Sequence, residues 1–245
     1  MYLEFVKQLA KTQDEIEYLT SLCEISPSQT GIDIIVAYKN NFKSGFFVEF
    51  GAADGYKASN TYLLEKNFNW KGILVEPAKY FHPLLNKNRT VTIDHRCVAE
   101  NSNNQIYFLE EEFPRTTYSH VHGYPGSTQA KYSNKYILNT VSLKDLLDSH
   151  NAPDVVDFLS IDTKGGEFEI LRGYDFSRPI KIISIDWGTQ YIKDKSQIHY
   201  IRTLLKDRYI EISAENSHVS YKNWADNGRY YNVQNSCNEG WFLLK

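Results

Sequence analysis

Short apolar runs alternate with stretches of helical spacing from residue 45 onward, and this alternation limits the chain to an α/β fold. Such runs are typical of parallel strands that are buried on both faces of a sheet. The stretches between them repeat apolar residues at three- and four-residue steps, which predicts helices. We therefore expect a seven-stranded, mostly parallel sheet with helices on both faces. The predicted strands are Phe46–Phe50, Gly72–Val75, Val91–Val98, Val156–Ile161, Ile180–Ile185, Tyr209–Ser213 and Gly240–Leu244.

The helices predicted between these strands are Ala58–Asn67, Ala78–Asn88, Ser142–Ser149, Glu167–Arg172 and Ser196–Asp207. Residues 2–41 indicate two further helices with a break at Ser26-Pro27-Ser28. We therefore divide the chain into a helical N-terminal extension, residues 1–44, and a main domain, residues 45–245. Residues 110–135 and 216–236 fit neither pattern and are predicted to be long loops, which in a compact domain are usually functional lids or disordered.

Composition agrees with an ordinary folded protein. Of the 245 residues, 42% are hydrophobic and 23% are charged, which excludes disordered and fibrous chains. With 27 Lys and Arg against 30 Asp and Glu, the net charge is −3, and nothing marks the chain as a nucleic-acid binder. The three cysteines form no CxxC pair and no zinc spacing, and no apolar run reaches the roughly 18 residues of a membrane span. We expect a cytoplasmic protein without a membrane span; its oligomeric state is left open.

The segment Phe47–Gly55, FVEFGAADG, carries the sharpest local signal. Here an apolar strand enters a turn of small residues and then a predicted helix. Gly51 keeps a side chain out of the path of a ligand, and Gly55 is free to adopt a positive φ, so backbone N–H groups can approach a ligand closely. A tight turn that binds nothing has the same pattern.

Glu76 ends the next predicted strand, 21 residues after Gly55. A carboxylate at this position lies beside the glycine turn, where it can accept hydrogen bonds from both hydroxyls of a ribose. The turn lacks the G-x-G-x-x-G pattern of a dinucleotide site, and Asp54 within it repels a pyrophosphate but suits a cationic ligand. These residues favour S-adenosylmethionine over a nicotinamide cofactor.

Three separated blocks resemble the FkbM family of S-adenosylmethionine-dependent methyltransferases: FFVEFGAADGYKASNTYLLEKNFNWKGILVEP, VVDFLSIDTKGGEFEILRGYDFS and IKIISIDWG. The resemblance covers residues 45–188. It implies a Rossmann-like methyltransferase fold, S-adenosylmethionine as the cofactor, and O-methylation of a hydroxyl of a sugar, a glycan or a nucleotide sugar. The alternatives are a lipid-linked, secondary-metabolite or protein acceptor, or a non-catalytic cofactor-binding domain that serves in interactions.

The resemblance also implies which residues bind the cofactor. They are Glu49, Gly51, Ala52, Asp54, Gly55, Ser59, Asn60, Glu76, Pro77, Cys97, Val98 and Asp162. The chain departs from the family in two places. In SIDTKGGE, where Asp162 and Glu167 match the family pattern, Lys164 stands where members usually have an acid. Members often carry an acid followed by His and Asn where this chain has Asp186-Trp187-Gly188.

Methyl transfer to a hydroxyl needs a group that takes the hydroxyl proton. Asp162 and Asp186 end neighbouring predicted strands, so both are expected to face the crevice at the carboxyl ends of the sheet. One hypothesis is that they and Glu167 bind a divalent cation, Mg²⁺ or Mn²⁺, which acidifies the hydroxyl. The alternative is that Asp162 orients the cofactor or the acceptor. Lys164, if its pKa is lowered, and His120, whose ordinary pKa lies near neutrality, are the other candidate catalytic residues.

Overall fold

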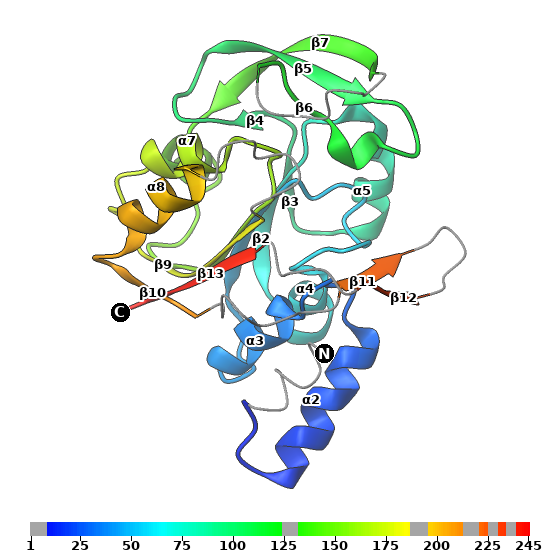
Figure 1. The fold of residues 1–245 in the computed structure, drawn as a ribbon, viewed down its shortest axis with the longest axis vertical. Coiled ribbons are helices and arrows are strands. Elements are labelled where there is room, and N and C mark those ends of the chain that lie inside the picture. The colour runs from blue at the N-terminus through cyan, green and yellow to red at the C-terminus, as the bar shows by residue number, and fades with distance from the viewer. Residues whose placement is uncertain (1–8, 124–131, 187–195, 213–220, 225–229, 234–238) are drawn as a thin grey trace.

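The structure is a computed structural model, and it describes residues 9–123, 132–186, 196–212, 221–224, 230–233 and 239–245. Figure 1 shows a central twisted sheet with helices on both sides, a second sheet above it, and the N-terminal helices below it. The prediction of an α/β fold with helices on both faces is confirmed.

Seven strands form the main sheet in the order β10-β13-β9-β8-β1-β2-β3. The pairs on either side of β1 and between β8 and β9 are parallel, whereas β13 runs antiparallel to both of its neighbours. The predicted seven-stranded, mostly parallel sheet is therefore correct. The strands are β1 (Phe46–Phe50), β2 (Lys71–Val75), β3 (Thr92–Asp94), β8 (Val156–Ile161), β9 (Ile180–Asp186), β10 (Tyr209–Glu211) and β13 (Glu239–Leu244).

Each face of the sheet has its own core, because successive side chains of a strand point to opposite faces. Val48 and Phe50 belong to a buried cluster with residues of α6 (Leu143–Ser149), α7 (Glu167–Arg172) and α8 (Ser196–Leu205). Phe47 belongs to a second buried cluster with residues of α4 (Tyr62–Phe68) and α5 (His82–Asn88). This arrangement leaves the carboxyl ends of the parallel strands open between the two helix layers.

The N-terminal extension contains two helices, as predicted: α2 (Gln13–Ile25) and α3 (Ile32–Lys39). The side chain of Thr12 caps α2 by accepting a hydrogen bond from the Glu15 N–H at 3.2 Å. Leu19 of α2 and Ile35 of α3 lie in the same buried cluster as Phe47 of β1. The extension thus packs directly on the sheet, and a boundary at residue 44 stays a prediction.

A second, four-stranded sheet was missed in the sequence. It has the order β4-β7-β5-β6 and consists of β4 (Cys97–Val98), β5 (Gln105–Glu111), β6 (His120–Val121) and β7 (Tyr132–Val141). The prediction of one strand over residues 91–98 is wrong, because the Asp94 carboxylate accepts hydrogen bonds from the Arg96 backbone and side chain and the chain turns there into the other sheet. The prediction of a loop over residues 110–135 is wrong where these strands and the 3₁₀ turn η2 (Thr116–Tyr118) form.

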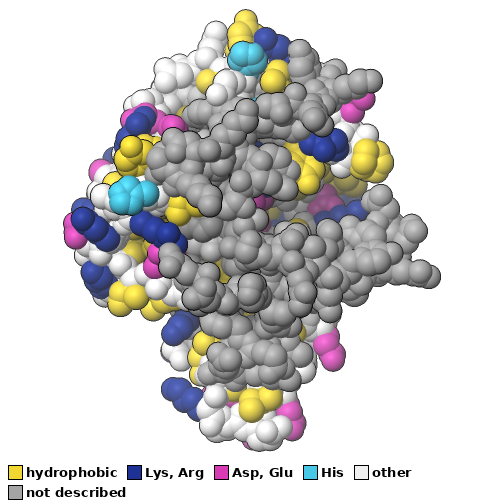
Figure 2. Space-filling view, in the orientation of Figure 1, with side chains coloured by type: hydrophobic (Ala, Val, Ile, Leu, Met, Phe, Trp, Pro, Cys, Tyr) yellow, Lys and Arg dark blue, Asp and Glu magenta, His cyan; other side chains and the backbone are white. Residues whose placement is uncertain are grey.

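The second predicted loop, residues 216–236, contains β11 (Tyr221–Trp224) and β12 (Tyr230–Val233), which pair antiparallel; the rest of it lies outside the described residues. None of the helices in the described part of the chain combines the length and apolarity needed to cross a bilayer. Charged side chains of both signs are spread over the described surface in Figure 2.

Candidate active site

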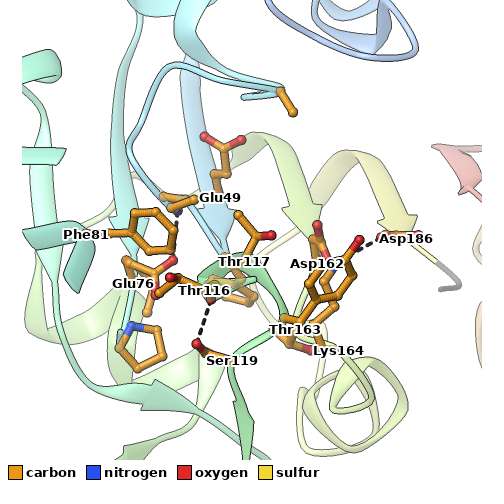
Figure 3. Close-up of a pocket in the computed structure, with 18 of the residues that line it drawn as sticks. Glu49, Glu76, Phe81, Thr116, Thr117, Ser119, Asp162, Thr163, Lys164 and Asp186 are labelled. Carbon is orange, nitrogen blue, oxygen red and sulfur yellow. Dashed lines mark hydrogen bonds and ion pairs between the residues drawn. The ribbon is translucent and has the colours of Figure 1, made fainter. Parts of the chain in front are cut away.

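A cavity of about 650 Å³ opens at the carboxyl ends of the central strands. Each of these strands contributes the residues at its end: Gly51 after β1, Glu76 after β2, Asp162 after β8 and Asp186 at the end of β9. Figure 3 shows the side chains of Glu76, Asp162 and Asp186 around one space. The volume is that of an ordinary small-molecule site.

Eleven of the twelve predicted cofactor residues line this cavity: Glu49, Gly51, Ala52, Asp54, Ser59, Asn60, Glu76, Pro77, Cys97, Val98 and Asp162. Gly55 does not line it; a Cβ there would lie 2.6 Å from side-chain atoms of Leu85 and Arg89, so this glycine allows close packing behind the turn. The structure thus brings the predicted set together, and its role in cofactor binding stays a prediction.

Gly51 lets β1 and β8 approach each other at the edge of the cavity. It has a φ of +74°, and a Cβ added there would lie 2.1 Å from the carbonyl oxygen of Asp162. The Asp162 N–H in turn donates to the Phe50 carbonyl at 3.2 Å. Any side chain at position 51 would therefore push the turn away from the strand end that carries Asp162.

Glu49 holds the loop between β1 and α4. Its buried carboxylate accepts hydrogen bonds from the Ser59 hydroxyl at 3.0 Å, the Asn60 N–H at 2.8 Å and the Thr61 hydroxyl at 2.6 Å. These bonds explain why α4 begins at Tyr62 and not at Ala58 as predicted. Glu49 therefore shapes the wall of the cavity as well as lining it.

Arg89 fixes the same loop from behind and was not singled out in the sequence. Its fully buried guanidinium donates to the Gly55 carbonyl at 3.0 Å, the Ser59 hydroxyl at 3.1 Å and the Thr61 hydroxyl at 2.9 Å, and it pairs with Glu65. An arginine at the end of a predicted helix is more often solvated, so the sequence carried no signal for this role.

Glu76 lies buried at the end of β2 with both carboxylate oxygens already oriented. One oxygen accepts from the Ala53 N–H at 2.7 Å and the other from the Ala78 N–H at 2.7 Å. Burial raises the pKa of Glu76 to about 7 despite these two bonds. Since each carboxylate oxygen has two lone pairs, each can accept one further hydrogen bond from a ligand in the cavity.

Lys164 lies between Asp162 and Asp186 at the other side of the cavity (Figure 3). Its ammonium contacts the Asp162 carboxylate and lies 3.2 Å from Oδ2 of Asp186. Burial disfavours the charged ammonium, but the two carboxylates outweigh this effect and raise the pKa of Lys164. The prediction that Lys164 acts as a base requires a lowered pKa, which the two carboxylates oppose.

The predicted metal site of Asp162, Asp186 and Glu167 is not supported. The Glu167 carboxylate does not line the cavity and instead accepts hydrogen bonds from the Thr163 N–H at 3.0 Å and the Gly165 N–H at 3.0 Å. Within the described ranges, no group of three or more His, Cys, Asp or Glu side chains is placed to hold a metal ion. The space between the two aspartates is taken by the ammonium of Lys164.

His120 faces away from the cavity. Its neighbours Ser119 and Val121 line the cavity, whereas His120 is buried on the other side of β6 with Nδ1 3.0 Å from the Tyr118 carbonyl and 3.9 Å from the Glu111 carboxylate. Because side chains alternate along a strand, His120 does not share the cavity lining of its neighbours, and the described cavity gives its predicted catalytic role no support.

The second sheet and the N-terminal extension also line the cavity. The second sheet and its η2 turn contribute Phe108, Thr116, Thr117, Tyr118, Ser119 and Val121. Gln29 comes from the loop between α2 and α3. Glu239, at the start of β13, accepts hydrogen bonds from Thr30 at 3.1 Å and Trp241 at 2.9 Å, and burial raises its pKa to about 7. Trp187 and Gly188 lie outside the described residues.

The described lining of the cavity is strongly acidic. It contains Glu49, Asp54, Glu76, Asp162, Asp186 and Glu239 against only Lys57 and Lys164. A cleft with this excess of carboxyl groups attracts a cationic ligand and repels an anionic one. A doubly wound sheet with an acidic ligand cavity at its strand ends is the arrangement of a Rossmann-like ligand-binding domain.

The chain belongs to the family described as the methyltransferase FkbM domain, whose model matches residues 49–211. Among solved structures, it is similar to a methyltransferase FkbM from Methylobacillus flagellatus KT, with 11% identity and a TM-score of 0.48 over 99% of this chain and 58% of that chain. It is also similar to an O-methyltransferase from Bacillus cereus in complex with S-adenosylhomocysteine, with 10% identity and a TM-score of 0.43 over 99% of this chain and 96% of that chain.

A third similar structure is a ribosomal protein L11 methylase from Lactobacillus delbrueckii subsp. bulgaricus, with 9% identity and a TM-score of 0.41 over 89% of this chain and 78% of that chain. The chain thus spans 58% of the length of the Methylobacillus protein. Among curated protein sequences, none matches this chain. The family membership places the protein among the methyltransferases and agrees with the resemblance found in the sequence.

Proposed function

We propose that this protein is an S-adenosylmethionine-dependent O-methyltransferase that methylates a hydroxyl of a sugar or glycan. The observation that carries the proposal is the acidic cavity at the strand ends, in which two backbone N–H groups hold the Glu76 carboxylate. This combination suits a ligand that has both a ribose and a positive charge.

The residues at this cavity fit S-adenosylmethionine. Glu76 can still accept hydrogen bonds from two ribose hydroxyls, and Pro77, Cys97 and Val98 provide apolar surface for an adenine ring. The acidic lining favours a sulfonium and an ammonium group. When bound, S-adenosylmethionine supplies an electrophilic methyl group and leaves as the neutral thioether S-adenosylhomocysteine.

Asp162 is the residue we assign to the acceptor hydroxyl. It is enclosed by the cavity walls, although 40% of its side-chain surface stays open to the cavity itself. Burial raises the pKa of Asp162, Lys164 lowers it and Asp186 raises it again, with a net increase. A carboxylate with a raised pKa is a better base near neutrality, so Asp162 takes the hydroxyl proton.

The walls opposite the strand ends support a hydroxyl-rich acceptor. Thr116, Thr117, Tyr118 and Ser119 line the cavity from the η2 turn and the residue after it. Side chains that both donate and accept hydrogen bonds suit an acceptor with several hydroxyls. The excess of carboxyl groups favours an uncharged sugar over a nucleotide sugar, whose diphosphate it would repel.

A calorimetric titration with S-adenosylhomocysteine, run beside NAD⁺ as the control, tests the cofactor. We expect binding of the first and none of the second; failure of S-adenosylhomocysteine to bind contradicts the proposal. Transfer of a labelled methyl group to a panel of sugars then tests the acceptor. Transfer only to lipid or protein acceptors would leave a methyltransferase but reject the sugar.

A further inference from the structure

Lys164 occupies a central place in the cavity. Its ammonium lies between the carboxylates of Asp162 and Asp186, which come from the ends of the neighbouring strands β8 and β9. Only 16% of its side chain is exposed. A positive charge is therefore built into the site at the point where two carboxylates converge.

The backbone holds Lys164 in an unusual conformation. Its φ is +57°, in the left-handed region that residues with a side chain rarely adopt. Glu167 stabilises the surrounding loop, because its carboxylate accepts hydrogen bonds from the N–H groups of Thr163 and Gly165 on either side. Such conformations persist where surrounding contacts enforce them, and they are concentrated at functional sites.

We propose that Lys164 is the resident cation of this active site: its ammonium takes the place of a divalent metal ion between Asp162 and Asp186 and holds the acceptor oxygen. The inference rests on the proposed methyl transfer to a hydroxyl. An ammonium has three donors, and two of them are directed at the two aspartates. The third is available to an acceptor oxygen in the cavity that Lys164 lines.

A fixed positive charge at this place serves the reaction in the way that a metal ion would. It stabilises the negative charge that develops on the acceptor oxygen as Asp162 takes the proton. It also keeps a divalent cation out, because two positive charges would have to share the space between the same carboxylates. Lys164 thus performs the role that the sequence analysis assigned to a divalent metal ion.

Binding of Mn²⁺ to the full chain, followed by calorimetry, tests this assignment without an acceptor. Lys164→Glu places a third carboxylate between the two aspartates and should bind Mn²⁺ at least about tenfold more tightly than the wild type, since hard cations prefer several oxygen ligands. Lys164→Met removes the positive charge without adding a negative one. It should bind Mn²⁺ more weakly than Lys164→Glu but more tightly than the wild type. It replaces Lys164→Glu in the test if that variant does not fold. Lys57→Glu makes the same charge change elsewhere on the cavity wall and should gain no site.

The assignment is overturned if the wild type binds Mn²⁺ and the Asp162→Asn variant does not. It is also overturned if the wild type and both Lys164 variants bind Mn²⁺ with equal affinity. Titration of S-adenosylhomocysteine into the wild type tests the proposed function separately. If S-adenosylhomocysteine does not bind, the comparison of Mn²⁺ affinities still tests the role of Lys164. With an active sugar acceptor, wild-type turnover should survive exhaustive chelation, and Lys164→Met should lower it by about 100-fold or more. Loss of wild-type turnover on chelation would refute the role of Lys164.

Discussion

Replacement of Arg89 by methionine should destabilise the protein and weaken cofactor binding together. Arg89 is fully buried and pairs with Glu65, and its Nη1 also lies 3.6 Å from Glu49. Methionine fills a similar volume but removes the buried cation from both carboxylates and leaves Glu65 the ammonium of Lys66, 2.8 Å away, as its cationic partner. Breaking a buried ion pair from one side costs about 3–5 kcal/mol, a large part of the roughly 5–15 kcal/mol of stability that a domain has.

For a chain of this length, a change of that size lowers the Tm by roughly 6–20 °C, since about 1 kcal/mol corresponds to about 2–4 °C. The affinity for S-adenosylhomocysteine should fall as well, because the guanidinium also holds Gly55, Ser59 and Thr61 in the loop that lines the cavity. Thermal unfolding by circular dichroism and calorimetric titration measure the two effects on the same samples.

The pH dependence of unfolding gives an independent check. Burial disfavours the charged form of the Glu65 carboxylate. The charge of Arg89 and the hydrogen bonds that Glu65 accepts from Lys66, Arg89 and the Thr90 N–H outweigh this effect and lower the pKa of Glu65 from 4.5 to about 2. The folded state therefore gains stability from this group above about pH 4.5 and loses it as the pH falls toward about 2. In Arg89→Met this acid-sensitive component should be smaller, because Glu65 keeps Lys66 and the Thr90 N–H but loses the attraction of the buried guanidinium.

Two further variants separate the ion pair from general damage. Arg172→Met removes an arginine that is 48% exposed and paired with Glu100 on the surface, and should change the Tm very little. The double variant Arg89→Met/Glu65→Gln removes the uncompensated charge and should recover part of the lost stability. If Arg89→Met melts at the same temperature as Arg172→Met, the ion pairs and hydrogen bonds of Arg89 do not stabilise the loop between β1 and α4 as described.

Four more outcomes follow from the site. Glu76→Ala should lower the affinity for S-adenosylhomocysteine roughly 5- to 150-fold, since unpartnered hydroxyls cost about 1–3 kcal/mol; unchanged affinity in calorimetry would remove Glu76 from the cofactor site. Because the pKa of Glu76 rises from 4.5 to about 7 on folding, the unfolded state loses its proton first, and wild-type stability should fall between these pH values. Urea unfolding should show that Glu76→Gln lacks this component, and the same slope in both proteins would contradict the burial argument. Gly51→Ala should lower the free energy of unfolding by about 1–2 kcal/mol because of the left-handed backbone at this position alone. It should also weaken S-adenosylhomocysteine binding, because the added Cβ would lie 2.1 Å from the Asp162 carbonyl oxygen. A urea unfolding midpoint equal to that of the wild type would contradict this prediction. Asp162→Asn should lower turnover by about 100-fold or more with little change in cofactor affinity, whereas equal losses of both would make Asp162 a cofactor residue.

The main sheet was predictable because its signals are local. β1 and β8 begin and end at the predicted residues, since a strand buried on both faces is a continuous apolar run whatever its partners are. Ser142 was correctly placed at the start of α6, where its side chain accepts from the Asp145 N–H at 3.1 Å. The positions of Glu76 and Asp162 at strand ends followed from the same runs.

The second sheet was not predictable in this way. β5 and β7 pair antiparallel and leave residues such as Tyr107 and Ile137 half exposed, so their sequences show neither a continuous apolar run nor a clean alternation. For the same reason the cavity residues between β5 and β6, including Thr116 and Ser119, were assigned to a loop. The contribution of Gln29 depends on how the extension packs, which has no local pattern.

By itself, the sequence determined the family, the order of the strands along the chain and the residues at their ends, because these depend on composition and spacing within short segments. Only the tertiary structure decided what those residues can do. Lys164 is placed between two carboxylates because Asp186, from a different strand, lies 3.2 Å from its ammonium. His120 lies outside the cavity lining, although its neighbours Ser119 and Val121 belong to it. The charge state and direction of a side chain depend on neighbours that are distant in the chain, and folding alone brings them together.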